Sequence, residues 1–224
     1  MSFVDSPWDS FTSKIDTLRS DQRRADVNIL LASEAEKRQL GRLKSSILMW
    51  LYSSLESFVR DILTSMVEEV ESRNPQLLRL KPCFHALCYN HIFKRISDSP
   101  KTGNDMWQLR QEASREVLEN PTASFDAIPF DGSILRGGHF QHIWDYFEFE
   151  GHHLPPQRGS HETALQELAD DRNDLAHGHR DPTRLGRQVT ASELKRRINL
   201  IEEVSEHLYL TAYQYVDERN YLRT

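Results

Sequence analysis

Residues 43–70 read LKSSILMWLYSSLESFVRDILTSMVEEV, and this stretch decides the fold. Apolar side chains recur here at intervals of three and four residues, which is the spacing of one face of an α-helix. The apolar positions are Leu43, Ile47, Leu48, Leu51, Leu55, Phe58, Ile62, Leu63, Met66 and Val70. The pattern predicts a central core helix over residues 40–72, and Asn74-Pro75 ends it because proline cannot continue a helix.

Helical spacing also marks both ends of the chain. Ser6 and Pro7 form a suitable N-cap and first turn for a polar N-terminal helix that covers the core. Its thin apolar stripe comprises Phe11, Ile15, Leu18 and, later, Leu30-Leu31. Thr190 and Glu193 predict a capping box for a long last helix that packs back on the central one. The apolar stripe of that helix comprises Leu194, Ile198, Ile201, Val204, Leu208, Ala212, Tyr215 and Val216.

Shorter helices and an irregular insert fill the middle of the chain. Helices are expected over residues 77–96, with an interruption near Pro82, and over residues 104–118 and 140–149. Proline and glycine break the helical period on both sides of the last of these, so we expect an irregular insert over residues 121–159. The expected fold is all-α: a single antiparallel helical bundle over residues 1–224 with one irregular loop insertion.

The composition, with 38% hydrophobic and 28% charged residues and a net charge of -6, is ordinary for a soluble protein. No apolar run approaches a membrane span and the N-terminus lacks the order of a secretory signal, so we expect a cytoplasmic protein without membrane contact. Cys83 and Cys88 lie beside apolar residues, which indicates packing rather than a disulfide framework. The chain lacks the glycine-rich phosphate loops and the G-x-S-x-G elbow, which disfavours a nucleotide-driven motor or a serine hydrolase.

Residues 172–179 read RNDLAHGH and carry the candidate chemistry. They end a helix that opens near residue 160 and stops at Gly178. The apolar residues of this helix are Leu165, Leu168, Leu175 and Ala176. Arg172 points within about 20° of Leu165, so a guanidinium lies on the stripe that should meet the core or a partner. His177 lies in the last turn, where the helix dipole favours imidazolium and where imidazole titrates near neutral pH.

Arg172 and His177 are five residues apart, so their side chains diverge by about 140° on a straight helix. One copy of the chain therefore converges poorly on a single phosphate. Two copies that meet across a two-fold axis would place two arginines and two histidines around one cleft. The spacing predicts a homodimer with a composite site.

This stretch resembles the R-x4-H signature of HEPN-superfamily ribonucleases, with Arg172 and His177 at the signature positions and Asn173 as the polar residue after the arginine. The preceding loop and short helix also resemble those of small HEPN-like proteins of bacterial toxin and defence loci. The resemblance implies a metal-independent, cofactor-free endoribonuclease, in which the substrate's 2′-hydroxyl attacks the adjacent phosphate and leaves a 2′,3′-cyclic phosphate and a 5′-hydroxyl. Arg172 would hold the phosphate and His177 would move protons. It further implies a toxin or antiviral defence effector that acts on RNA, with a cognate antitoxin or regulatory protein as a possible partner.

Five other residues are candidate supports for this site. We expect Asn173 to hydrogen-bond the substrate or fix the histidine, and Asp174 to orient the histidine. His179 either contacts substrate or faces water. Glu56 either pairs with the arginine one helical turn later or orients the catalytic arginine or histidine. Arg136, beside two glycines, could reach a phosphate, although turn chemistry alone explains the glycines.

Three other interpretations remain open at this point. An R-x4-H string arises by chance, with Arg172 paired to Asp171 or to an acid on a neighbouring helix and His177 only a favourable C-terminal cation. An inactive HEPN-like dimer could instead bind RNA, a nucleotide or a protein. A histidine-rich metal hydrolase is the third, because His139 and His142 lie one turn apart, although no metal-binding motif accompanies them.

Charge changes sign across the motif. The acids Glu167, Asp170 and Asp171 precede it. The cations that follow it are Arg180, Arg184, Arg187, Lys195, Arg196 and Arg197, with Asp181 and Glu193 among them. We expect RNA to approach the basic side, and ordinary salt bridges on a solvated helix are the alternative.

Overall fold

A computed structural model describes residues 2–26, 32–100, 102–119, 123–125, 128–129, 135–156 and 158–223. Within these ranges the chain is all-α, and its one β-type feature is an isolated bridge between Leu80 and Leu222. The helices are α1 (Asp5–Ala25), α2 (Glu34–Ser72), α3 (Pro82–Cys88), α4 (Asn90–Ser97), α5 (Asn104–Glu119), α6 (Gly137–Phe147), α7 (Arg158–Ala176), α8 (Pro182–Gln188) and α9 (Ala191–Asp217), with a 3-10 turn, η2 (Leu77–Arg79), after α2. The all-α prediction is confirmed.

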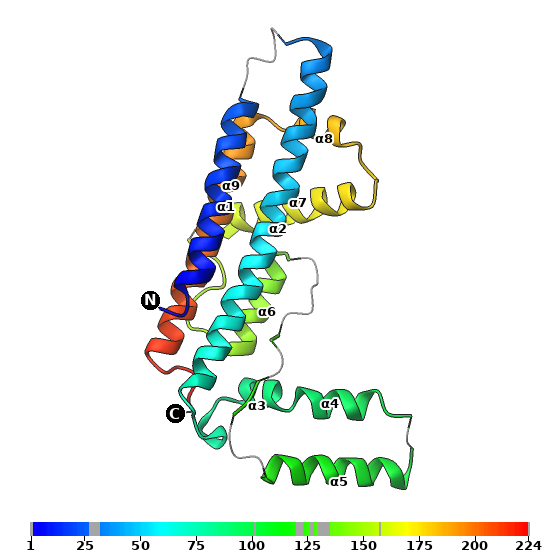
Figure 1. The fold of residues 1–224 in the computed structure, drawn as a ribbon, viewed down its shortest axis with the longest axis vertical. Helices are drawn as coiled ribbons and strands as arrows, with labels where there is room; N and C mark the ends of the chain where they lie inside the picture. The colour runs from blue at the N-terminus through cyan, green and yellow to red at the C-terminus, as the bar shows by residue number, and fades with distance from the viewer. Residues whose placement is uncertain are drawn as a thin grey trace.

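Three long helices form the trunk of the molecule (Figure 1). α1 runs antiparallel to α2 and α9, and the latter two run in the same direction (Figure 1). α2 contacts both of the others along its length, as its apolar stripe predicts. The stripe positions of the three helices are buried, except Leu43 of α2, which is half-buried. Those of α1 are Phe11, Ile15 and Leu18. Leu30 and Leu31, which sequence analysis adds to the α1 stripe, lie outside the described residues.

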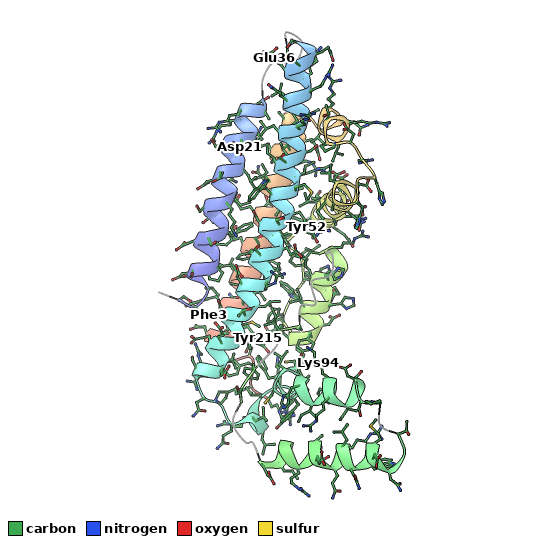
Figure 2. The ribbon with its side chains drawn as sticks, turned by 45° about the vertical axis from the view of Figure 1, so that its right-hand side comes forward. Phe3, Asp21, Glu36, Tyr52, Lys94 and Tyr215 are labelled. Atoms are coloured by element: carbon green, nitrogen blue, oxygen red, sulfur yellow. The ribbon has the colours of Figure 1, made fainter. Side chains whose placement is uncertain are left out.

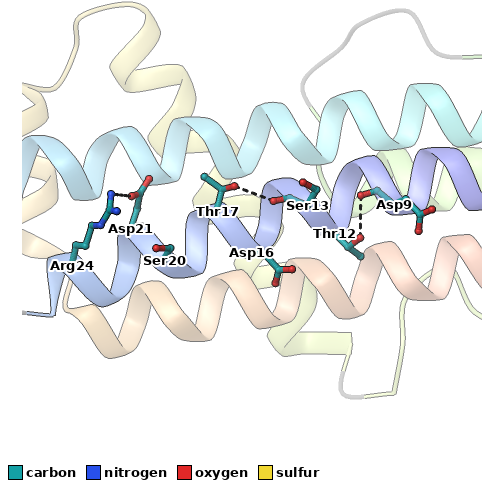
Figure 3. Close-up of a pocket in the computed structure, with 8 residues that line it drawn as sticks. All are labelled: Asp9, Thr12, Ser13, Asp16, Thr17, Ser20, Asp21 and Arg24. Carbon is teal, nitrogen blue, oxygen red and sulfur yellow. Dashed lines mark hydrogen bonds and ion pairs between the residues drawn. The ribbon is translucent and has the colours of Figure 1, made fainter.

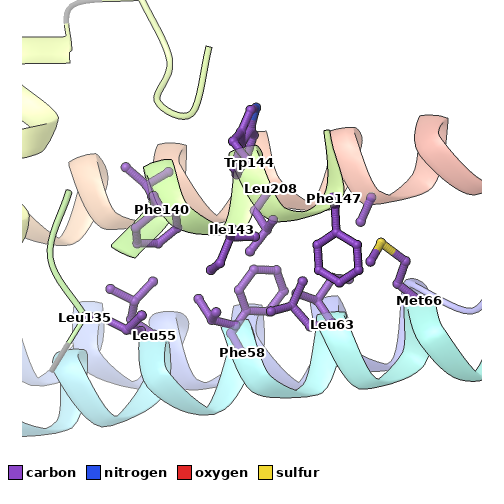
Figure 4. Packing of buried hydrophobic residues seen from close by; sticks show 14 of the residues in the cluster. Leu55, Phe58, Leu63, Met66, Leu135, Phe140, Ile143, Trp144, Phe147 and Leu208 are labelled. Atoms are coloured by element: carbon purple, nitrogen blue, oxygen red, sulfur yellow. The ribbon is translucent and has the colours of Figure 1, made fainter. Parts of the chain in front are cut away.

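The core continues from the trunk onto α6, which covers the lower half of α2 (Figure 4). Phe140, Ile143 and Phe147 of α6 point toward Leu55, Phe58, Leu63 and Met66 of α2, with Leu208 of α9 beside them (Figure 4). At about 25 cal/mol per Å² of apolar surface, the burial of such large side chains is the main stabilising contribution to folding. The predicted apolar face of the 140–149 helix is therefore confirmed.

α8 is a short helix that sequence analysis did not predict. Asp181 is its N-cap, accepting a hydrogen bond from the amide of Arg184 at 2.9 Å, and Pro182 is its first residue. The helix packs so closely on α2 that a Cβ added at Gly186 would lie 1.8 Å from the carbonyl oxygen of Gly41. Buried Lys44 of α2 donates to the carbonyl of Val189 at 2.8 Å, which satisfies the end of α8 and the ammonium together.

α4 and α5 stand away from the trunk as a hairpin (Figure 1). The predicted helix over 77–96 is divided into η2, α3 and α4, because Pro82 starts a new helix and Tyr89 leaves helical geometry between α3 and α4. The predicted helix over 104–118 is confirmed as α5. Large side chains on this hairpin remain exposed, among them Phe93, Trp107 and Leu118.

Three helix starts differ from the sequence predictions. α1 begins at Asp5 rather than after Ser6, because the Asp5 carboxylate accepts from the amide of Ser2 at 2.6 Å and closes the first turn. α2 begins at Glu34, six residues before the expected start, with Ser33 and Glu36 in a capping box. α6 includes Gly137 and Gly138, which sequence analysis placed in the irregular insert.

The predicted irregular insert is described only in part. Residues 151–156 form no helix, as expected, and α6 ends at Phe147, two residues before the predicted end, because Glu148 takes the left-handed conformation. Residues 120–122, 126–127, 130–134 and 157 lie outside the described residues. Cys83 and Cys88 are both buried and free, in accord with a packing role. Across the described ranges, no helix combines the length and apolar character needed to span a lipid bilayer.

Candidate active site

α7 crosses α2 near the middle of the trunk and carries the R-x4-H residues (Figure 1). Of its predicted apolar residues, Leu165 and Leu168 are buried against the core, whereas Leu175 is half-buried and Ala176 is exposed. The helix ends in a Schellman motif: the Gly178 amide donates to the Leu175 carbonyl at 3.2 Å, and the His179 amide donates to the Asp174 carbonyl at 2.8 Å. Gly178 has φ +69°, the left-handed conformation that glycine adopts without strain, so the predicted stop is confirmed.

Arg172 packs its guanidinium on the ring of Tyr52. The arginine Cζ lies 5.4 Å from the ring centroid, within the range of a cation–π contact. Arg172 is half-buried, and no carboxylate in the described part of the chain lies within ion-pair distance of it. The position on the apolar stripe is thus explained by an aromatic partner. The hydrogen-bond donors of Arg172 are therefore available to an anion.

Tyr52 is held in place at both ends of its side chain. It lies on α2 (Figure 2) and is 1% exposed. Its phenol oxygen accepts a hydrogen bond from the Leu135 amide at 2.7 Å. Burial raises the pKa of Tyr52, so the phenol stays neutral at physiological pH. The aromatic ring that contacts Arg172 is therefore held in one position by burial and by this hydrogen bond. Sequence analysis missed this role because Tyr52 occupies an ordinary position on the apolar stripe of α2.

His177 lies one residue beyond the end of α7 and is exposed. Its amide donates to the Asn173 carbonyl at 3.1 Å. Its ring stacks against that of His179, with centroids 5.7 Å apart and an interplanar angle of 29°. The exposed imidazole is accessible to a substrate from solvent.

Asp171, next to Arg172, is engaged with other arginines. Arg197 of α9 donates to its Oδ2 at 2.7 Å and Arg180 donates to its Oδ1 at 3.1 Å, while the carboxylate is 7% exposed. The alternative in which Arg172 simply pairs with Asp171 is therefore not what the structure has. A buried carboxylate needs such partners, so Arg197 fixes the end of α7 against α9.

Arg197 is the centre of a wider ion-pair network. Its Nη2 lies 3.0 Å from Glu167 Oε2, and its Nε lies 2.9 Å from Glu193 Oε1. The guanidinium groups of Arg196 and Arg197 lower the pKa of Glu193 to about 2. Thr190 caps α9 by accepting from the Glu193 amide at 3.0 Å, but the Glu193 carboxylate binds the two arginines, so only half of the predicted capping box forms.

The expected basic side of the motif is largely neutralised. Arg180, Arg196 and Arg197 pair with the acids that precede the motif or with Glu193, and Arg187 pairs with Glu34 of α2 at 2.8 Å. Arg184 and Lys195 are exposed and have no ion pair among the described residues. The sequence places these cations together, but the fold brings the acids of α7 and α2 alongside them.

The five candidate supports lie at different places around the site. Asn173 and Asp174 flank the site on α7, and the Asp174 carboxylate faces Arg180 Nε at 3.4 Å and His179 Nδ1 at 3.9 Å rather than His177. Arg136 lies beside α7, with its Nη2 2.8 Å from Asp170 Oδ1. Glu56 is half-buried one turn beyond Tyr52, and no ion pair joins it to Arg172 in the described structure.

The remaining histidines are dispersed. His139 and His142 face each other with ring centroids 6.4 Å apart, and buried His161 lies 2.8 Å from Glu203. Among the described residues, no three His, Cys, Asp or Glu side chains are grouped to hold a metal ion. The metal-hydrolase alternative therefore has no ligand cluster in this part of the chain.

The fold and the R-x4-H helix define a HEPN-type helical domain. A family model described as RiboL-PSP-HEPN matches residues 16–212, which is most of the chain. The protein belongs to this family of the HEPN superfamily. Neither a curated protein nor a solved structure matches the chain. Superfamily membership supports a nuclease or RNA-related role.

Proposed function

We propose that the protein is a metal-independent endoribonuclease that acts as a toxin or antiviral defence effector. The observation that carries the proposal is the state of Arg172: a half-buried guanidinium, held on the Tyr52 ring, with no carboxylate partner among the described residues. Its neighbours Arg136, Arg180 and Arg197 are all paired with acids. An unpaired, positioned guanidinium is suited to a phosphate, which it can bind bidentately.

In this mechanism Arg172 stabilises the charge that develops on the phosphate as the 2′-hydroxyl attacks it. His177 transfers the proton, either from the 2′-hydroxyl or to the leaving 5′-oxygen. Charge stabilisation and general acid–base catalysis together supply what the reaction requires from the protein. The products are a 2′,3′-cyclic phosphate and a 5′-hydroxyl.

A homodimer supplies the second arginine and histidine. The five-residue spacing turns Arg172 and His177 away from each other on one helix, and Arg172 lies within α7 whereas His177 lies beyond its end. We propose that α7 pairs with α7 of a second copy, so that the arginine of each copy approaches the histidine of the other.

The test is cleavage of mixed cellular RNA in EDTA by the wild type, Arg172→Ala and His177→Ala, with analysis of the product ends. We expect each variant to lose at least about a hundredfold in rate, because positioned acid–base and electrostatic groups each contribute on that order. Arg42→Ala and His142→Ala are matched controls, since both residues are exposed and lie on α2 and α6 rather than on α7. Mixing the two inactive variants should restore part of the activity, because mixed dimers contain one intact arginine and one intact histidine.

Full activity in either site variant would contradict the catalytic assignment, and a monomer at working concentrations in sedimentation would contradict the composite site. If neither the wild type nor any variant cleaves RNA although each is folded and dimeric, the competing proposal is favoured. In that case the protein is an inactive HEPN-like dimer that binds RNA, a nucleotide or a protein.

A further inference from the structure

A cavity of about 460 Å³ lies at the end of the trunk opposite α8, where the end of α2, η2 and the C-terminal segment meet. Cavities of this size are typical of small-molecule sites. Its polar lining is Arg73, Asn74, Gln76, Arg79, Arg219 and Tyr221. None of these residues belongs to the proposed ribonuclease site, which lies on α7.

The charge of this cavity departs from that of the whole chain. The chain has 34 acidic and 28 basic residues, yet the cavity lining has three arginines and no carboxylate. The Arg73 guanidinium already has two partners within the protein: its Nε pairs with Glu69 at 3.0 Å and its Nη1 donates to the Val216 carbonyl at 2.7 Å. Arg79 and Arg219 are exposed and have no ion pair in the described structure.

The hollow along α1 in Figure 3 provides a contrast. It is lined by three carboxylates, those of Asp9, Asp16 and Asp21, and by one guanidinium, that of Arg24. Arg24 pairs with Asp21 at 3.1 Å (Figure 3). The arginine of that hollow is therefore neutralised by the protein, whereas Arg79 and Arg219 have no carboxylate partner among the described residues.

Backbone hydrogen bonds hold the wall of the cavity in place. The Lys81 amide donates to the Tyr221 carbonyl at 2.9 Å, and the Arg223 amide donates to the Arg79 carbonyl at 2.8 Å. These bonds join the two segments on either side of the cavity, and Tyr221 is 3% exposed. The backbones that carry Arg79 and Arg219 are therefore fixed relative to each other.

Arg219 occupies a backbone position that favours glycine. α9 ends in a Schellman motif, in which the Arg219 amide donates to the Val216 carbonyl at 3.2 Å and the Asn220 amide donates to the Tyr215 carbonyl at 2.9 Å. Arg219 has φ +59°, and the corresponding position at the end of α7 is Gly178. A long side chain is strained in this conformation, and such residues concentrate at functional sites.

We propose that this cavity binds a phosphate group, carried by a free nucleotide or by the 5′ end of a nucleic acid strand. Arg79 and Arg219 bind the phosphate oxygens, because the guanidinium fork matches phosphate geometry. The side-chain amides of Asn74 and Gln76 provide donors and acceptors for the rest of the ligand. This site is independent of RNA cleavage and does not rest on the proposed function.

Calorimetric titration of the protein with AMP tests the proposal. We expect AMP to bind with a Kd below about 1 mM at low salt, and Arg79→Gln/Arg219→Gln to weaken it by about tenfold or more. The control is Arg38→Gln/Arg42→Gln, which removes two exposed arginines from α2 far from the cavity. Absence of AMP binding in the wild type, unchanged binding in the cavity variant, or equal loss in the control would overturn the site.

Two further measurements complete the test: one excludes a folding defect, and the other identifies what carries the phosphate. Arg219→Gly relieves the strained backbone, so we expect a Tm unchanged or higher by roughly 2–4 °C together with weaker AMP binding. Unchanged AMP binding in this variant would contradict the role of the guanidinium. Tighter binding of a 5′-phosphorylated oligodeoxynucleotide than of AMP assigns the site to a strand end, and the reverse order assigns it to a free nucleotide. Such oligonucleotides lack the 2′-hydroxyl, so the proposed cleavage reaction does not affect the measurement.

Discussion

Tyr52 combines two interactions in one buried side chain. Its ring supports Arg172 from below, while its hydroxyl accepts the hydrogen bond of the Leu135 amide. The amide lies immediately before the N-terminus of α6, so one tyrosine connects α2, α6 and α7. The position of Arg172, the residue proposed to bind phosphate, thus depends on a buried tyrosine on another helix.

Substitution of Tyr52 separates these interactions. Tyr52→Phe keeps the ring and leaves the buried Leu135 amide without its acceptor, so the free energy of unfolding should fall by about 1–3 kcal/mol with RNA cleavage retained. Tyr52→Leu also removes the cation–π contact, and cleavage should fall as well. Urea unfolding and cleavage rates measure the two effects. Tyr213→Phe, on the exposed side of α9, is the control and should change stability by less than about 0.5 kcal/mol. Wild-type stability of Tyr52→Phe would mean that the hydrogen bond contributes nothing.

The sequence indicates which residues are unusual but not which residues face them in the fold. The periodicity of α7 singles out Arg172, since a charge on an apolar stripe violates the pattern. The partner, Tyr52, lies 120 positions earlier and fits its own stripe, so no local signal marks it. The same limit applies to Asp171, whose partner Arg197 sits on another helix. The roles of Arg172 and His177 in catalysis stay predictions.

α8 shows how closely two helices can approach when both present glycine. A Cβ at Gly186 would meet the backbone of Gly41, and a Cβ at Gly41 would lie 2.6 Å from the Thr183 carbonyl oxygen. Sequence analysis missed this helix because its seven residues are too few to show a period. The signal that could have revealed it is Asp181-Pro182, an N-cap followed by a proline at the first helical position.

Gly186→Ala should therefore displace α8 from α2. The added methyl group would collide with backbone atoms, which cannot rotate away, so we expect a loss of about 1–3 kcal/mol or more in the free energy of unfolding. Gly138→Ala is the matched control: no atom lies within 4 Å of its Cβ, and alanine should be neutral or slightly stabilising in α6. Thermal unfolding compares the two, and equal Tm values would contradict the close packing. Because α8 follows the R-x4-H segment directly, cleavage should decline with Gly186→Ala.

The whole molecule has a trunk and a projecting hairpin with unequal support. α2 and α9 lie in the shared core, whereas α5 packs mainly on α4 (Figure 1). Trp107 of α5 is 67% exposed. Helices with few buried apolar contacts open locally at a lower free energy than the core. The long trunk helices could be predicted from periodicity, but the projection of the hairpin could not, because periodicity says nothing about which helix a face meets.

Hydrogen exchange should distinguish these two parts. We expect the amides of α5 to exchange at least tenfold faster than those of α2 and α9, because their opening requires less of the core to separate. Exchange followed by proteolysis and mass spectrometry resolves the helices, with α1 as an internal reference from the trunk. Equal protection of α5 and α9 would show that the hairpin unfolds only with the whole domain.

The ion pairs between α7 and α9 have a consequence for how the molecule would attract a polyanion. A protein that binds RNA through many free cations gains affinity by releasing the counterions condensed on the strand. Here Arg180, Arg196 and Arg197 already face internal carboxylates, which leaves Arg184 and Lys195 as the cations after the motif without an ion pair among the described residues. Few such ions would therefore be displaced. Capture of RNA at α7 would then vary little with ionic strength. Selection among RNAs would depend on how well the strand fits the fixed guanidinium above Tyr52.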